Sequence, residues 1–420
     1  MSSIWQPSAV EHRRGERGFT LIEMLITMAI TTVILGATMV AMNNATSATQ
    51  TAQQLGDLNN GLRTAMDLMV RDLLQVGQGL PSGRSILIPN GASSLTMQLP
   101  GPDGSDYYYD GQSFCPPDPP DDIDTVCEQI QAVIPGPGRG PAVEVNGVTG
   151  PNTDMITTLA ADSAFDTVDL IAFAADGRSI TVALPCAAAP ATCPTSTTGA
   201  NGHRISDSPD VDLDNVRPGD LIMITKGSNS ALMQVSGVSG QVISFQGNDS
   251  LRLNQTAAAD GTGLELRNTA PVDVIPSPQT TPPQYLVSSK ATRIRMISYY
   301  LDVTTDAKHP RLIRRINNGD WSNFDNTLGT VVAFDVENLQ FTYDLSDGVT
   351  NPSNVKMDDN DFGINGACRP NPCYPSQIRK INIYLSGRSR LPRRGSNQYF
   401  RNRLATQVSL RSLAFVDRYR

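Results

Sequence analysis

The chain has 420 residues, a formal net charge of −8 and 18% charged residues, a length that excludes one small domain and allows one large or two modest ones. The chain has only three histidines and contains no G-x-S-x-G elbow, H-E-x-x-H pair or G-K-[ST] phosphate loop, which argues against an enzyme.

The charged residues are unevenly distributed along the chain. Eight acids and no base lie between Asp103 and Glu128, whereas eleven bases and a single acid, Asp417, lie between Ser376 and Arg420. Such a basic end could bind nucleic acid or an acidic partner. We interpret it as a solvated sheet face or a match to a neighbouring subunit, and expect no nucleic acid.

A short polar leader with three arginines precedes an apolar run that begins at Phe19 and continues to about Met42. In an ordinary secretory signal the hydrophobic region comes before the cut site. Here Gly18, the residue that suits a cut, comes before the hydrophobic run, so cleavage would leave the helix on the product and make Phe19 its N-terminus. As a helix the run spans about 36 Å, enough to cross a hydrocarbon core of about 30 Å once.

Glu23 lies inside this run and becomes the fifth residue after cleavage. A carboxylate in a membrane segment costs about 3 kcal/mol on insertion scales and usually has a partner and a function. This cost argues against the alternative, a plain signal anchor in which Glu23 is a tolerated polar residue. We expect Glu23 to pair with the amine on Phe19 of a neighbouring subunit and to hold that neighbour in axial register.

Gly18, Phe19 and Glu23, with the basic leader and the uninterrupted helix, resemble the N-terminus of type IV pilins and the pseudopilins of type II secretion. The resemblance implies that a prepilin peptidase cuts after Gly18 and methylates the new amino group of Phe19. It implies other minor and major pilins, the inner membrane, a pilus assembly platform and a possible tip adhesin as partners. A single-pass inner-membrane protein with a periplasmic head, later placed in a surface pilus, is the corresponding localisation, and no cofactor is expected.

Beyond the membrane segment, the proline-free helix is predicted to continue to Gly77. Apolar residues recur there at intervals of three and four and form one stripe, which consists of Leu55, Leu58, Leu62, Met66, Met69, Leu73 and Val76. Four charged residues are expected to face elsewhere: Arg63, Asp67, Arg71 and Asp72. Gly77, Gly79 and Pro81 end the helix.

The remaining chain is predicted to be mostly β. Residues 79–152 are rich in proline, glycine and acids and are expected to be loops, with short strands at 94–99 and 142–145. Short β-type runs between turns predict a β-rich insertion at 153–275. A C-terminal antiparallel sheet at 284–420, with strands at 292–303, 311–316, 331–343, 378–385 and 406–415, is expected to cover the stripe of the helix. With the leader at 1–18 and the helix at 19–78, of which 19–42 is transmembrane, this is an α+β fold.

Three stretches resemble the large PilW-type minor pilins. They are Arg71–Gly77, Gly219–Ile224 followed by Met233-Gln234-Val235, and Val336–Asp344. The resemblance implies a minor pilin that initiates or caps type IV pilus assembly by helix packing and not by catalysis. The alternatives are a minor pseudopilin of a type II secretion system and a pilus-tip adhesin. The long proline-rich loops depart from the pattern of that family.

Six cysteines form three local pairs: Cys115 with Cys127, Cys186 with Cys193, and Cys368 with Cys373. An even number in an exported chain predicts disulfides. Zinc would need four ligands, usually in C-x2-4-C pairs, and only Cys368 and Cys373 approach that spacing.

A second cluster of possible metal ligands is acidic, and consists of Asp344, Asp347, Asp358, Asn360 and Asp361. These residues could form a nonstandard calcium site. They fail the EF-hand template, because Phe362 takes its fifth position and Arg369 its twelfth. We interpret them as solvated loop acids and expect no metal.

Overall fold

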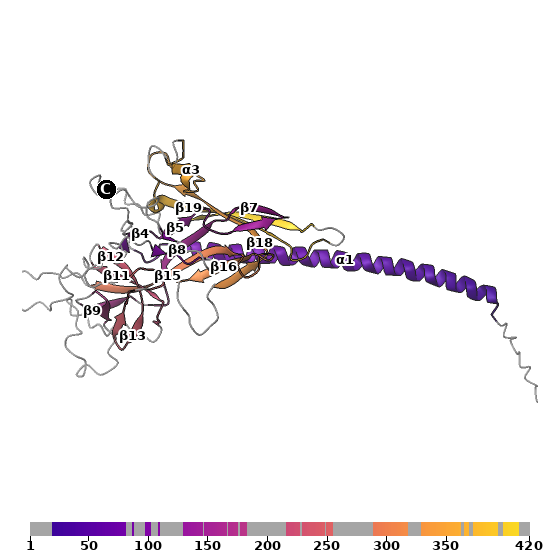
Figure 1. Cartoon of the computed structure of the whole chain (residues 1–420), viewed down its shortest axis with the longest axis horizontal. Helices are drawn as coiled ribbons and strands as arrows, with labels where there is room; N and C mark the ends of the chain where they lie inside the picture. The colour runs from indigo at the N-terminus through magenta and orange to yellow at the C-terminus, as the bar shows by residue number, and fades with distance from the viewer. Residues whose placement is uncertain are drawn as a thin grey trace, which may run out of the picture.

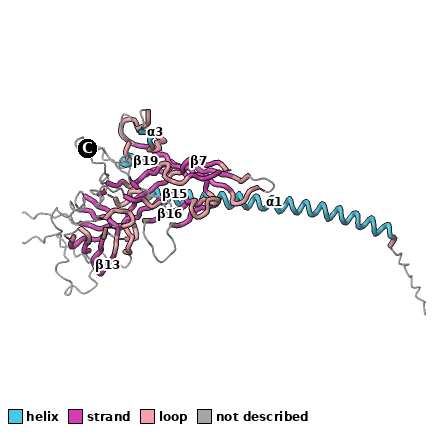
Figure 2. The backbone as a smooth tube through the Cα atoms, viewed as in Figure 1, coloured by secondary structure: helices cyan, strands magenta, loops and turns pink. Residues whose placement is uncertain are grey.

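A computed structural model places one long helix at the N-terminus of a β-rich head (Figure 1). The described residues are 19–80, 86–87, 97–101, 108–109, 129–145, 147–165, 167–174, 177–182, 216–226, 229–247, 249–254, 289–317, 329–362, 365–368, 373–393 and 398–410. Figure 2 shows that only the second half of the helix is surrounded by strands, while the first half projects from the head. The α+β prediction is therefore confirmed.

Helix α1 (Leu21–Leu74) begins after the N-cap Thr20 and ends at the C-cap Gln75. Gly77 and Gly79 follow with φ of 75° and 71°, in the left-handed region that glycine adopts without a Cβ penalty. The predicted stripe is confirmed, because its members from Leu58 onward are all buried: Leu58, Leu62, Met66, Met69, Leu73 and Val76. Toward the N-terminus the large apolar side chains from Phe19 to Met42 are exposed.

A large sheet of thirteen described strands forms most of the head. Its strands are β1 (Ile86–Leu87), β4 (Gln129–Ile130), β5 (Val133–Gly136), β8 (Met155–Ala161), β9 (Val168–Phe173), β10 (Ser179–Val182), β11 (Leu221–Lys226), β12 (Asn229–Gln234), β13 (Gly237–Ser239), β14 (Val242–Ser244), β15 (Ser289–Asp302), β16 (Arg311–Ile316) and β17 (Thr330–Phe334). The longest, β15, pairs antiparallel with β8, β9, β11 and β16. Strands from 153–275 and from 284–420 thus share one sheet, so the expected boundary between these segments is not a boundary between sheets.

A second sheet has the order β18-β19-β20, all antiparallel, from β18 (Val336–Leu345), β19 (Ile378–Arg388) and β20 (Arg401–Ser409). Alternate side chains of β18 are buried, as the sequence predicts for a sheet with one covered face. Between β18 and β19 lie α3 (Asp359–Phe362) and a 3-10 turn, η6 (Pro375–Gln377). Two small hairpins complete the described strands: β2 (Met97–Gln98) with β3 (Tyr108–Tyr109), and β6 (Ala142–Val145) with β7 (Val148–Asn152).

Two predicted strands differ from the structure. The expected strand at 331–343 is divided at Asp335, whose φ of 59° interrupts the extended backbone, so β17 belongs to the large sheet and β18 to the small one. The expected strand at 406–415 begins earlier, at Arg401, and residues 411–420 lie outside the described part of the chain.

Both sheets contribute to the packing around α1. Residues of α1 share one hydrophobic core with β15, β16, β18, β19 and β20. Near the start of the buried half, Asn402 of β20 donates its side-chain amide to Asn59 Oδ1 at 2.5 Å. Near its end, the Gly77 amide donates to the Leu159 carbonyl of β8 at 2.9 Å. Strands of 284–420 thus cover the stripe as predicted, but they belong to two sheets and not to one, and β8 from the preceding segment also contacts the end of the helix.

Candidate functional site

The projecting half of α1 carries the residues that the sequence assigns to processing and assembly. Phe19 is 82% exposed, and Gly18 lies outside the described residues. Thr20 and Glu23 form a capping box: the Thr20 amide and hydroxyl each donate to Glu23 Oε2 at 3.0 Å, and the Glu23 amide donates to Thr20 Oγ1 at 3.3 Å. Within one chain, the Glu23 carboxylate therefore accepts hydrogen bonds at the N-terminus of its own helix and helps to cap it.

No charged residue occurs between Glu23 and Asp57 in the sequence. The first part of this interval is apolar, and the second, from Asn43 to Gly56, consists mostly of alanine, serine, threonine, asparagine and glutamine. Among the described residues, α1 is the one helix long and apolar enough to cross a membrane. The head buries none of the most apolar window of α1, which leaves an apolar surface suited to contact with lipid or with other helices.

Asp72 connects the buried half of α1 to the large sheet. Its carboxylate accepts a hydrogen bond from the Tyr299 hydroxyl of β15 at 2.5 Å. It also forms a salt bridge with Arg314 of β16, whose Nε donates to it at 2.6 Å. Burial, and then the bond to Asp72, hold the pKa of Tyr299 well above its ordinary value, so the hydroxyl stays a donor. The sequence prediction that Asp72 faces away was wrong. The signal was present, since Ala65, Met69, Asp72 and Val76 follow the intervals of four, three and four that define one helix face.

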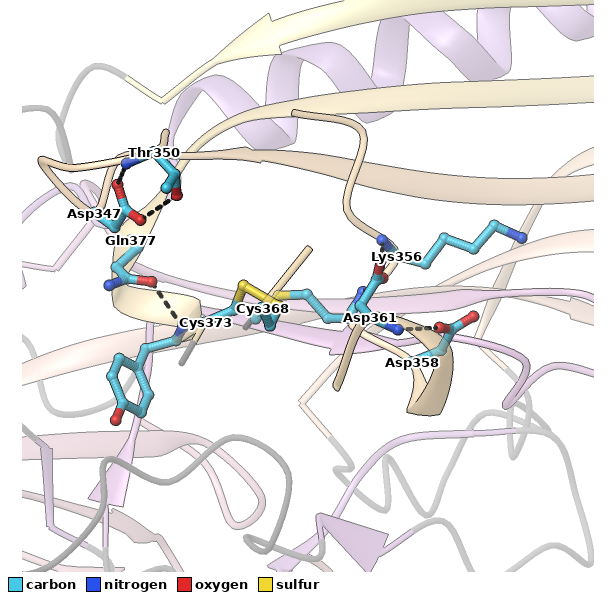
Figure 3. The surroundings of a disulfide bond; sticks show 10 residues. Asp347, Thr350, Lys356, Asp358, Asp361, Cys368, Cys373 and Gln377 are labelled. Atoms are coloured by element: carbon cyan, nitrogen blue, oxygen red, sulfur yellow. Dashed lines mark hydrogen bonds between the residues drawn. A yellow bond between two sulfur atoms is a disulfide. The ribbon is translucent and has the colours of Figure 1, made fainter. Parts of the chain in front are cut away.

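The segment between β18 and β19 holds the last cysteine pair and all of the acidic cluster except Asp344, which lies near the end of β18. Figure 3 shows the disulfide with Asp347, Asp358 and Asp361. Cys368 and Cys373 form a disulfide and both are buried. The other four cysteines, Cys115, Cys127, Cys186 and Cys193, lie outside the described residues, so their pairing stays a prediction.

The acids of this segment are bonded to separate turns. Asp347 accepts hydrogen bonds from the Thr350 hydroxyl and from the amides of Val349, Thr350 and Asn351, which hold its pKa well below the ordinary value. Asp361 accepts the amides of Lys356 and Met357 at 2.7 and 2.8 Å. No group of three acidic, histidine or cysteine side chains among the described residues is arranged to hold a metal ion. Hydrogen bonds within local turns therefore account for the positions of Asp347 and Asp361.

Comparison with known proteins identifies the N-terminal segment. The family model of the prokaryotic N-terminal methylation motif matches residues 13–39. No curated protein and no solved structure matches the chain. The matched segment contains Gly18, Phe19 and Glu23 and overlaps the exposed apolar half of α1.

This combination supports membership of the type IV pilin-like family, which includes pilins and pseudopilins. The motif implies processing by prepilin peptidase and pilin-type assembly, and proteins of this family are structural, not catalytic. One apolar N-terminal helix also fits single-pass anchoring in a membrane.

Proposed function

We propose that this protein is a minor pilin of the PilW type that helps to initiate or cap a type IV pilus. The observation that carries the proposal is the division of α1 into a half buried in its own head and a largely exposed half that has no charged residue from Met24 to Gly56. An uncharged helix surface can pass from lipid into a bundle of similar helices without the cost of burying a charge. The head then remains outside the bundle, first in the periplasm and later on the pilus.

In this proposal a prepilin peptidase cuts between Gly18 and Phe19, and the amine of Phe19 is methylated. Glu23 then exchanges its bonds to Thr20 for the amine on Phe19 of a neighbouring subunit. The capping box supports this step, because it shows that the carboxylate reaches the level of its own helix start, one residue from Phe19. Other minor and major pilins, the assembly platform and a possible tip adhesin are the proposed partners.

Two variants of Glu23 separate assembly from helix capping. Glu23→Gln keeps an acceptor for the Thr20 amide but removes the charge, whereas Glu23→Ala removes both. If the charge binds a neighbour's amine, both variants should be cleaved normally and enter sheared pilus fractions poorly. Asp57→Asn, which removes the next acid along the helix, is the matched control and should enter normally. Normal entry of Glu23→Gln would limit Glu23 to a capping role.

Deletion of the gene distinguishes the proposed function from its alternatives. Loss of surface fibres and of twitching motility would indicate a minor pilin. Loss of secreted enzymes with normal fibres would indicate a minor pseudopilin of a type II secretion system. Normal fibres that no longer attach would indicate a tip adhesin.

A further inference from the structure

The β19–β20 hairpin extends past the sheet to which it belongs. Arg388 and Arg401 are the last cross-strand partners, and beyond them the Ser389 amide donates to the Phe400 carbonyl at 2.8 Å. The Arg393 amide donates to the Gln398 carbonyl at 2.7 Å, so the two chain segments remain together. The exposed residues Arg390, Leu391 and Arg393 form what we call the hairpin tip, in which Leu391 is 60% exposed.

The hairpin tip lies at the base of the head, where α1 emerges. Arg401 precedes Asn402, whose side chain bonds to Asn59, and Leu58 is the first buried residue of α1. β19 and β20 run along α1, and their tip end is directed toward the exposed half of the helix (Figure 1). The tip therefore points toward the membrane that this half is suited to cross.

Helix and strand dimensions bring the tip to the membrane surface. From Met42, where the apolar run ends, to Asn59 the helix rises about 25 Å. From Arg388 to Arg393 an extended chain covers at most about 17 Å. The remaining distance of about 8 Å is close to the thickness of one headgroup layer, since a bilayer of about 40–45 Å has a core of about 30 Å.

Among the described residues, no ion pair joins Arg390 or Arg393 of the hairpin tip to an acid. Glu337 is buried and accepts from Arg401 at 2.8 Å and from Arg388 at 3.5 Å. Asp335 is buried and contacts His309 Nδ1 at 2.5 Å. Arg393 stacks over the Phe400 ring with 4.7 Å to its centroid, which keeps the guanidinium at the surface. Exposed arginines beside an exposed leucine suit an interface of anionic headgroups and acyl chains.

We propose that the hairpin tip binds anionic phospholipid headgroups of the bilayer that α1 crosses. The head is then held against the outer surface of the membrane beside its own anchor until the helix is withdrawn. This inference rests on single-pass anchoring and not on the proposed role in a pilus, and its test involves no fibre.

The test uses the full chain in nanodiscs of phosphatidylcholine alone or of phosphatidylcholine mixed with phosphatidylglycerol. A photoreactive p-benzoylphenylalanine replaces Leu391, and mass spectrometry measures the yield of lipid adducts. We expect adducts in the mixed discs, few in the neutral discs, and a lower yield in high salt. The double variant Arg390→Gln, Arg393→Gln should lower the equilibrium constant for docking of the tip on mixed discs about 25-fold, or about fivefold for each arginine.

Two further variants make the result specific to the tip. Lys356→Gln with Lys380→Gln removes the same charge from exposed positions outside the tip and should leave the adduct yield unchanged. Arg390→Lys with Arg393→Lys keeps the charge and should retain docking. Equal yields in the two kinds of disc, no adduct in either, or an equal loss in the Lys356 and Lys380 variant would each overturn the proposal.

Discussion

Asp72 stabilises the packing of α1 against the large sheet. It is a buried carboxylate bonded to Arg314 and Tyr299, both from the large sheet. Loss of one member of a buried ion pair leaves the other charge uncompensated, at a cost of about 3–5 kcal/mol. Because the Arg314 side chain is 16% exposed, water can recover part of this cost, so the lower end of the range applies.

We therefore predict that Asp72→Ala lowers the free energy of unfolding by about 3 kcal/mol. Chemical denaturation of the full chain in neutral detergent micelles would measure the change. Asp67→Ala, an exposed acid on the same helix, is the control and should change stability by less than about 0.5 kcal/mol. Similar values for the two variants would show that the buried ion pair adds no net stability.

Asp154 makes stability depend on pH in a direction opposite to that of most acids. It accepts the amides of Gly138 and Phe341, both at 2.8 Å, and so joins the β5 region to β18. Burial is the largest influence and raises its pKa above the ordinary value of 3.8. Between these two pKa values the folded state binds more protons than the unfolded state, so the Asp154 contribution to stability increases as pH falls.

The predicted effect of Asp154→Asn is a loss of stability that grows on acidification. The wild type gains this contribution as pH falls through its raised pKa toward the ordinary value of 3.8, whereas the variant has no carboxyl to protonate. Chemical denaturation of both proteins at pH values from about 7 to about 4 measures the difference between their free energies of unfolding. A difference that shrinks as pH falls would contradict the raised pKa.

At the scale of elements, the contact between β19 and α1 depends on a residue without a side chain. A Cβ on Gly387 would lie 2.9 Å from the Asp335 carbonyl oxygen and 3.1 Å from Leu62 Cδ2. We predict that Gly387→Ala separates β19 from the helix and costs about 1–3 kcal/mol. Gly237→Ala, where nothing lies within 4 Å of the added carbon, should change the melting temperature little. If both variants melt alike, the contact at Gly387 can relax without cost.

The sequence was most informative where one period of hydrophobicity extended over several turns or strands. The stripe of α1 and the alternation in β18 were predicted for this reason. The break at Asp335 was not, because the residues on both sides are β-type and only the positive φ of Asp335 separates them. The shared sheet was also missed, since the pairing of β15 with β8 and β11 joins distant segments that carry no local signal.

The sequence predicted the motif at the N-terminus of α1 better than it predicted the contacts of Asp72 with the large sheet. Gly18, Phe19 and Glu23 form a short motif with fixed spacing, which the family model also matches. The contacts of Asp72 needed the partners Tyr299 and Arg314, more than two hundred residues away. Polar residues on an apolar helix face are visible in a sequence, but their partners are not.

For the whole molecule, size predicts a position at the end of a fibre. A compact globule with as many residues as 79–420 would have a radius of gyration of about 20 Å, or be roughly 50 Å across. A helix that packs in a fibre core is only about 10 Å wide, so closely stacked heads of this size would clash. Gold-labelled antibody against segment 153–267 should mark fibre ends. Regular labelling along the shaft would contradict both the end position and the minor-pilin proposal.

The continuity of α1 also determines how the head responds to a mechanical load. A pull on the exposed half enters the head along the helix axis, and β19 and β20 run beside that axis (Figure 1). The load therefore acts in shear on the whole packed length from Leu58 to Leu73, about 23 Å of helix, and does not separate it one turn at a time. The ion pair of Asp72 with Arg314 lies near the far end of this length and resists sliding. Survival under tension is then a matter of the unfolding rate of the head and not of its equilibrium stability.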